Sequence, residues 1–260
     1  MLTRLPRIAF IKRFIASLLR YTGTIDTNRD SIHIFCRVRD RGVRADGGGM
    51  FIRNLKPEEL DLIHRVELFV TDGSRGKGRD PSNVFEVVRL SVEIARRVPH
   101  PVHPLIVVLT AMLHDLGARL LGESSIAGFV GASVAESFLK VTGVSDLERI
   151  QIVRAVAMAG SLAVMNPETQ EEKIVADAMR LDRMGMVGLI RSLLATDKPA
   201  EEFFRERVAT CQSDFEGLHF EESRQIGEPL YNQSKILAES LEKIYRLRPF
   251  SLDQIVLPQG

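Results

Sequence analysis

The stretch LIVVLTAMLHDLGA, residues 105–118, contains the longest apolar run of the chain and ends in a histidine followed by an aspartate. Its first nine residues leave no polar face, a pattern that predicts a central buried helix. Gly117 follows the pair closely, and we expect it to end this helix as its C-cap. A carboxylate at the end of such a helix is costly to bury unless it is paired or binds a metal. His114 and Asp115 are therefore candidate metal ligands.

Helical periodicity dominates the chain from Met50 onward, and the alternation typical of strands is nearly absent. The predicted helices cover residues 55–73, 83–98, 105–117, 132–143, 145–160, 167–195, 201–217 and 228–247. On the second of these helices we expect a buried face made of Phe85, Val88, Val92 and Ala95. The sequence therefore predicts an all-α, bundle-like domain over residues 51–250, followed by a non-helical tail at 251–260.

Residues 1–50 form a basic extension to this domain. The first 53 residues hold 11 Lys and Arg against 4 Asp and Glu, whereas the rest of the chain holds 24 against 30. Apolar residues from Ile8 to Leu19 recur at helical spacing, which predicts a basic amphipathic helix; a linker with a short strand at 31–38 follows. Three interpretations stay open: an organellar transit peptide, an extension upstream of a true start near Met50, or a working amphipathic helix. We expect a cytoplasmic protein, or a mitochondrial or organellar one if the helix is a transit peptide.

Several classes of partner are not indicated. The body of the chain has no basic face, so we expect no nucleic-acid partner. The longest apolar run has nine residues, whereas a membrane-spanning helix needs roughly 20, so we expect no transmembrane segment. Cys36 and Cys211 lack metal-type spacing, and the glycine-rich loop at 74–83 lacks the Walker pattern and is interpreted as a connector. No feature of the sequence indicates an oligomeric state.

Two further segments accompany TAMLHDLGA, which spans residues 110–118: DPSNVFEVVRL at residues 80–90 and VADAMRLDRMGMVGLIR at residues 175–191. In this order the three segments resemble the HD-domain superfamily of metal-dependent phosphohydrolases, particularly its bacterial branch of small nucleotide pyrophosphohydrolase-like proteins. The resemblance covers residues 75–195 well and the C-terminal helices loosely. It implies an all-α HD-domain helical bundle and a divalent metal (Mn, Mg, Fe or Ni) held by four ligands, among them His114 and Asp115.

The resemblance also implies a histidine ligand in the upstream segment and an aspartate ligand in the downstream one. This sequence has Val87 and Met179 at those two positions, and Asn83 where an earlier histidine of the motif would lie. Valine has no lone pair to offer, and a thioether is a soft ligand mismatched to a hard ion. The metal site is therefore expected to be degenerate, with two of four ligands replaced.

Neighbouring side chains are candidates to rebuild the site. Asp182 shares a helix face with Met179, and Asp177 also remains in the segment, but a displacement of one helical turn, about 5 Å, exceeds the tolerance of metal–oxygen bonds. Asp182 is nevertheless a candidate third metal ligand, and Glu86 a weaker one. Arg180 and Asn83 are candidate substrate-binding residues, whereas we expect a structural salt bridge from Arg191.

The remaining histidines and methionines show no pattern of a site. His64 is expected on a helix surface, His100 and His103 in a loop, and His33 and His219 have no partner spacing. No histidine forms a nucleophilic triad with an obvious serine or cysteine, and no G-x-S-x-G elbow occurs. The three methionines Met179, Met184 and Met186 are expected to pack in the core.

Three functions remain under consideration. The first is a metal-dependent phosphohydrolase acting on a nucleotide or another small phosphate ester, in which the ion would polarise a phosphoryl oxygen and activate water. The second is a non-catalytic HD-fold module that has lost its metal and binds a ligand or a protein partner. The third, an interaction protein whose amphipathic N-terminus docks on a membrane or partner, depends on the extension alone. The ligand replacements favour the second function, whereas the family resemblance favours the first.

Overall fold

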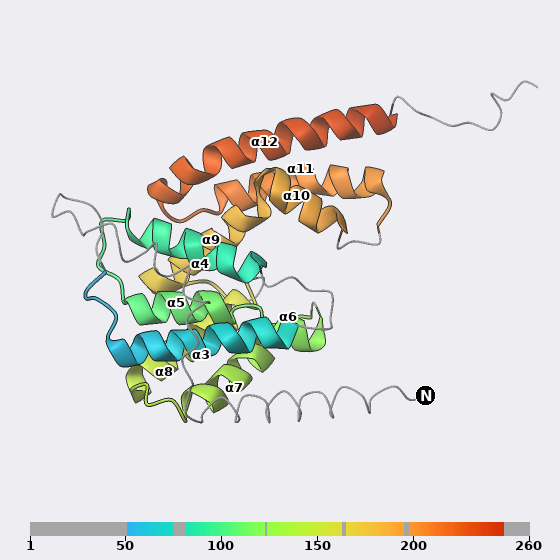
Figure 1. Ribbon diagram of the computed structural model, residues 1–260. Helices are drawn as coiled ribbons and strands as arrows, with labels where there is room; N and C mark the ends of the chain where they lie inside the picture. Colours follow the sequence, from blue (N-terminus) through green and yellow to red (C-terminus); the bar gives the residue numbers. More distant parts are fainter. Residues whose placement is uncertain (1–50, 75–81, 123, 163–164, 195–197, 247–260) are drawn as a thin grey trace, which may run out of the picture. The chain divides into compact units, whose positions relative to one another are not determined.

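The computed structural model describes residues 51–74, 82–122, 124–162, 165–194 and 198–246 (Figure 1). These residues are helical and contain no strand; a single isolated parallel bridge joins Phe51 to Val102. The prediction of an all-α fold is therefore confirmed. The expectations for the basic extension, most of the glycine-rich loop and the tail fall outside the described residues.

The helices fall into two compact units, residues 1–176 and 177–260, whose boundary lies within α9. The first unit contains α3 (Pro57–Ser74), α4 (Ser82–Ala95), α5 (Pro104–Leu113), α6 (Leu116–Leu121), α7 (Ala127–Leu139), α8 (Asp146–Ala159) and the start of α9 (Gln170–Arg183). The second contains the end of α9, α10 (Gly185–Leu194), α11 (Ala200–Glu216) and α12 (Glu221–Arg246). The assignment of residues 51–250 to one domain stays a prediction.

Helix α5 is the centre of the first unit. All ten of its residues are buried, and it packs against α3, α4 and α8 (Figure 1). Pro104 starts the helix at a position where a missing N–H costs nothing. The predicted central helix is confirmed, because a segment without a polar face can only be satisfied by neighbours on every side.

The end of α5 differs from the expectation. His114 is its C-cap, Asp115 is the N-cap of α6, and Gly117 lies inside α6 rather than ending α5. A Cβ at position 117 would lie 1.7 Å from the carbonyl oxygen of Ala127. Gly117 is therefore needed because α6 and α7 cross in backbone contact, and the prediction that it is a C-cap is wrong.

The buried face of α4 also differs in part. The fully buried apolar residues of this helix are Val84, Val87, Val88, Leu90, Ile94 and Ala95. Phe85 and Val92, expected on that face, are only partly buried. The helix carries apolar residues on more than half of its circumference, so its sequence is compatible with either of two neighbouring faces being buried. Packing against α5 decides which of the two faces is buried.

The second unit is built on an αα-hairpin of α11 and α12, joined by residues 217–220. Phe215 and Tyr231 stack across it with ring centroids 4.8 Å apart. The core consists of Leu189, Phe203, Phe204 and Ala238, with Leu193, Leu237 and Leu241 packed against it. The chain turns from α9 into α10 at Gly185, whose φ of +74° favours glycine. Of the three methionines expected in the core, Met184 is buried, Met179 is partly buried, and Met186 is exposed, so the prediction for Met186 is wrong.

Among the described residues, one segment is long and apolar enough to cross a membrane. Residues Pro104–Leu121 have a mean hydropathy of 1.5 over 18 residues. This window comprises α5, the His114–Asp115 junction and α6, and 72% of it is buried inside the protein. The sequence expectation considered only the nine-residue run and missed this longer window. One such helix is weak evidence for a membrane span, because the core helix of a globular protein passes the same test.

Candidate functional site

His114 lies at the C-terminal end of α5 and is 8% exposed. Its Nδ1 atom is 2.7 Å from the carbonyl oxygen of Ala111. Because a carbonyl oxygen only accepts, the hydrogen of a neutral His114 ring belongs on Nδ1, and Nε2 carries the lone pair. This backbone contact is the kind that orients histidine ligands in metal sites. The geometry therefore leaves His114 able to act as a ligand or a proton acceptor through Nε2.

Asp115 is paired within its own helix. Its Oδ2 accepts a hydrogen bond of 3.0 Å from Nε of Arg119, one turn further along α6, and both side chains are partly buried. The ion pair offsets the carboxylate charge, so a cation is not needed to compensate for its burial. Arg119 lies four residues after Asp115, and this spacing is a recognisable sequence signal for a helical ion pair.

The upstream candidates belong to the same unit as His114. Val87 lies on the buried face of α4 and is 1% exposed. Asn83 lies in the first turn of α4 and is partly buried. Glu86 forms an ion pair of 2.7 Å with Arg89 on the same helix. Position 87 is thus part of the hydrophobic core, and Glu86 has a structural partner.

The downstream candidates, Met179, Arg180 and Asp182, lie on the part of α9 that belongs to the second unit. Oδ2 of Asp182 accepts a hydrogen bond of 2.6 Å from Nη1 of Arg191. The other oxygen, Oδ1, is buried and has no hydrogen-bond partner among the described residues. Asp182 is therefore held as a structural acid by Arg191, with one oxygen left over.

The donor side chains of the described residues decide whether the protein can hold a metal ion. Among these residues, no group of three or more His, Cys, Asp or Glu side chains could hold a metal ion together. His114 and Asp115 are the two adjacent donors at the α5–α6 junction. Two donors do not fit the four-ligand centre that the family resemblance implies.

A second polar cluster surrounds a buried carboxylate in the second unit. Asp177 is 0% exposed and accepts hydrogen bonds from the backbone N–H groups of His219 and Phe220. Nδ1 of His219 lies 2.7 Å from Oδ1 of Asp177, and Nη1 of Arg180 lies 3.3 Å from the same ring nitrogen. His219 shows no partner spacing in the sequence, as expected, because 42 residues separate it from Asp177; only the tertiary structure reveals this partner.

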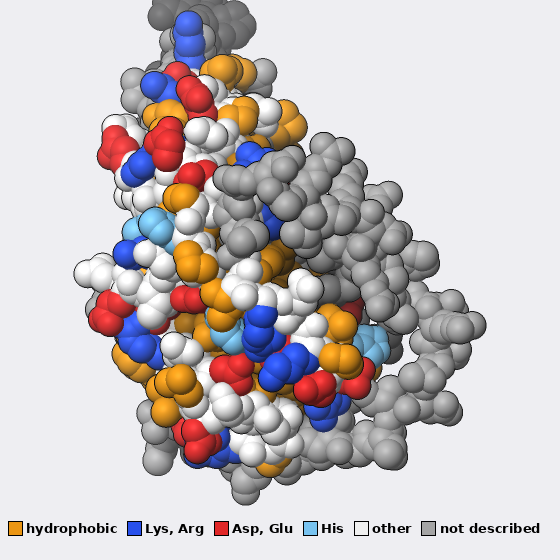
Figure 2. Space-filling view, turned by 90° about the vertical axis from the view of Figure 1, so that its left-hand side faces the viewer, with side chains coloured by type: hydrophobic (Ala, Val, Ile, Leu, Met, Phe, Trp, Pro, Cys, Tyr) orange, Lys and Arg blue, Asp and Glu red, His pale blue; other side chains and the backbone are white. Residues whose placement is uncertain are grey.

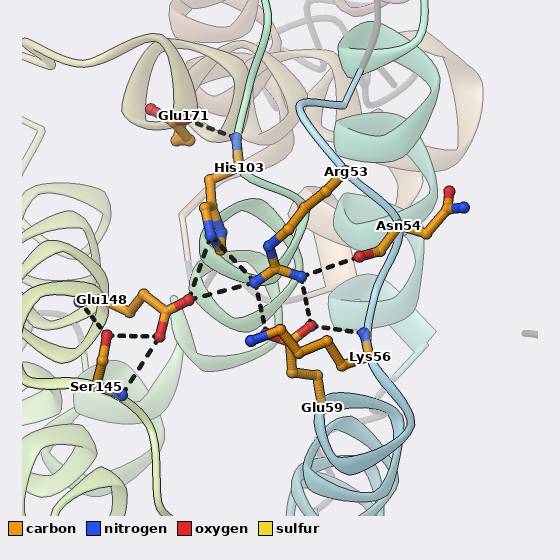
Figure 3. Close-up of polar contacts among 8 residues, drawn as sticks. All are labelled: Arg53, Asn54, Lys56, Glu59, His103, Ser145, Glu148 and Glu171. Carbon is orange, nitrogen blue, oxygen red and sulfur yellow. Dashed lines mark hydrogen bonds and ion pairs between the residues drawn. The ribbon is translucent and has the colours of Figure 1, made fainter.

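A third cluster ties the N-terminal end of the first unit to three helices (Figure 3). Arg53 donates to both oxygens of Glu59 at 2.6 and 2.7 Å and to Glu148 at 3.3 Å. His103, expected as a loop residue, is the N-cap of α5; its Nε2 lies 3.2 Å from Glu148, and its backbone N–H donates to Glu171. Burial and the charge of Arg53 lower the pKa of His103, and the hydrogen bonds from Arg53 lower the pKa of Glu59. The cluster fastens the start of the chain's described part to α3, α8 and α9.

His64 and His100 lie where expected, and His33 lies outside the described residues. His64 lies on α3, with Nδ1 3.5 Å from Glu67, and His100 is exposed in the turn before α5. On the face of the molecule that Figure 2 shows, Lys and Arg side chains alternate with Asp and Glu, with no broad area of one sign.

This helical arrangement, with a His-Asp pair at the end of the central helix, is the fold of HD-domain proteins. The chain is similar in structure to an HD-superfamily hydrolase from Bacillus thuringiensis, with a TM-score of 0.53 and 19% identity over 73% of this chain and 100% of the other. It is similar to Bacillus subtilis YpgQ in complex with ADP, with a TM-score of 0.55 and 19% identity over 74% and 98% of the two chains. A Listeria innocua protein gives a TM-score of 0.54 at 18% identity over 73% and 98%. Neither a family model nor a curated protein matches the sequence. The resemblance predicted from TAMLHDLGA is confirmed for the fold.

Proposed function

We propose that this chain is an HD-fold protein related to metal-dependent phosphohydrolases, with a degenerate metal site, that binds a nucleotide or another small phosphate ester without turning it over. The observation that carries the proposal is Val87, a hydrocarbon side chain 1% exposed in the core. The sequence resemblance assigns a histidine ligand to this position. A valine in that environment offers no lone pair to a cation. The ADP bound to YpgQ, a protein of the same fold, supports the choice of ligand.

The His114–Asp115 junction supports this function in two further ways. Arg119 offsets the charge of Asp115, so the junction remains stable in the absence of a cation. Nε2 of His114 retains a lone pair, so the ring can accept a hydrogen bond from a protonated phosphate or an adenine amine. Asn83, in the first turn of α4, remains a candidate substrate-binding residue.

An active phosphohydrolase is the second candidate, and the tautomer of His114 favours it. With Nδ1 bound to the Ala111 carbonyl, Nε2 is ready to bind Mn, Mg, Fe or Ni, with Asp115 beside it.

Metal analysis combined with ADP titration separates the two candidates. The full chain, purified without chelator and reconstituted with Mn²⁺, is expected to hold far less than one ion per chain, to bind ADP in the presence of EDTA, and to release no phosphate from nucleotides. Stoichiometric metal that is lost in His114→Ala and Asp115→Asn, together with phosphate release, would instead establish the hydrolase. His64→Ala, on the surface of α3, is the matched histidine control.

A further inference from the structure

The Asp177–His219–Arg180 cluster of the second unit has no place in the site described at the α5–α6 junction. The hydrogen-bonding capacity of its buried member, Asp177, is already used. Both carboxylate oxygens accept hydrogen bonds from backbone N–H groups, and Oδ1 also lies 2.7 Å from Nδ1 of the His219 ring. A ring nitrogen this close to a carboxylate oxygen carries the hydrogen. Nδ1 of His219 is thereby fixed as a donor to Asp177, and Nε2 is the ring atom left for a ligand.

Arg180 is not fully neutralised within this cluster. Its Nη1 approaches Asp177 only to 3.6 Å, beyond hydrogen-bond distance, and contacts Nδ1 of His219 at 3.3 Å. Arg183, one turn further along α9, is by contrast bound by two hydrogen bonds of 3.1 and 2.5 Å to Asp214. Burial and the nearby charge of Arg183 lower the pKa of Arg180, even against the attraction of Asp177 and Asp214. The guanidinium therefore lies where an additional anion would be stabilised.

The fold leaves room for the Arg180 side chain, and Arg180 and His219 are both accessible to solvent. A Cβ added to Gly217 would lie 3.2 Å from Nε and 3.4 Å from Cζ of Arg180, so the missing side chain at this position makes room for the guanidinium. The side chains of Arg180 and His219 remain 18% and 25% exposed, so a solute can reach both. A fork of N–H donors beside an imidazole matches the oxygens of a phosphate group.

We propose that Arg180 and His219 form a phosphate-binding site in the second unit, with Asp177 as the residue that positions the His219 ring. Arg180 supplies the charge and the N–H donors, and Nε2 of His219, which carries the lone pair, accepts a hydrogen bond from a phosphate O–H group. The proposal rests on the proposed function only for its ligand class, a phosphorylated small molecule. It does not use His114 or Asp115.

Inorganic phosphate is the probe, titrated into the full chain at constant ionic strength while the histidine ring signals are followed by NMR. Saturable binding is expected, with the His219 signal moving and the His64 signal unchanged. Arg180→Gln and His219→Gln are each expected to weaken binding roughly 10-fold to 100-fold, the effect of losing a hydrogen bond to a charged group. Arg224→Gln, which removes a neighbouring arginine that donates to the Leu218 carbonyl, is the matched control and should retain the wild-type affinity.

Asp177→Asn tests whether Asp177 positions the His219 ring. The phosphate affinity of this variant is measured under conditions where circular dichroism shows a folded chain. A weaker affinity supports a positioning role, whereas a lower melting temperature with wild-type affinity shows that Asp177 is only structural and overturns that part of the proposal. The site itself is wrong if Arg180→Gln and His219→Gln bind phosphate like the wild type, or if the wild type shows no saturation at about 10 mM. Loss of phosphate binding in His114→Ala alone would place the site at the α5–α6 junction and would leave the proposed function standing.

Discussion

Nδ1 of His219 lies 2.7 Å from Oδ1 of Asp177, although 42 residues separate the two in the chain. The carboxylate also accepts hydrogen bonds from the backbone N–H groups of His219 and Phe220, the two residues immediately before α12 begins at Glu221. One buried acid on α9 therefore fixes the start of α12 and the orientation of a histidine ring. Stability and ligand contact in the second unit both depend on this pair.

Replacing Asp177 with alanine should destabilise the second unit. We expect the free energy of unfolding to fall by about 2–3 kcal/mol, because the N–H groups that Asp177 accepts are left unpaired in a buried position. Urea denaturation followed by circular dichroism measures the change. Asp61→Ala, at an exposed position of α3, is the control and should change the same quantity by less than about 0.5 kcal/mol. Equal losses in the two variants would show that the Asp177 contacts contribute little.

Replacing Gly117 with alanine should strain the crossing of α6 and α7. The new Cβ would lie 1.7 Å from the Ala127 carbonyl oxygen, so one helix must move, at an expected cost of about 3 kcal/mol. Gly143→Ala is the comparison, since no atom lies within 4 Å of its added Cβ and only its φ of +77° disfavours alanine, by about 1 kcal/mol. Thermal unfolding of both variants shows which loses more stability, and we expect the larger loss in Gly117→Ala. A larger loss in Gly143→Ala would mean that α6 and α7 do not touch at this point.

Acid should destabilise the first unit in two steps. Burial and Arg53 lower the pKa of His103 below its ordinary 6.5, so the unfolded chain takes up this proton at a higher pH than the folded chain. Stability from this group is therefore complete above about pH 6.5 and declines as the pH falls below it. The pKa of Glu59, lowered by hydrogen bonds from Arg53, and that of Glu148 add a second decline below about pH 4.5, with the same sign.

His103→Gln separates these two steps. The variant cannot take up the histidine proton, so its unfolding free energy should stay level between about pH 6.5 and 5 while the decline below 4.5 persists. Urea denaturation at half-unit pH intervals measures both curves, with His100→Gln as an exposed control. A variant that declines as steeply as the wild type above pH 5 would assign that step to another group.

Val87 tests the degenerate metal site directly. Val87→Ala should lower the unfolding free energy by about 2 kcal/mol, because the side chain is buried in the core, and should leave ADP binding unchanged. Val87→His restores the family's ligand type and is expected to raise the Mn²⁺ content of the chain. Val88→His, at the neighbouring buried position, is the matched control and should gain no metal. A folded Val87→His chain with no more metal than this control would contradict the assignment of position 87 as a ligand position.

The sequence determined the helical fold, the central helix and the His114–Asp115 pair, because apolar periodicity and adjacent residues are local properties of the chain. Only the tertiary structure decided that Gly117 serves a helix crossing, that Val87 is in the core, and that His219 binds Asp177. The tertiary structure likewise decided the ion pair of Arg53 with Glu148, two residues that are 95 positions apart in the chain. Such contacts depend on which helices pack together and at what distance, and no spacing along a single helix encodes that choice.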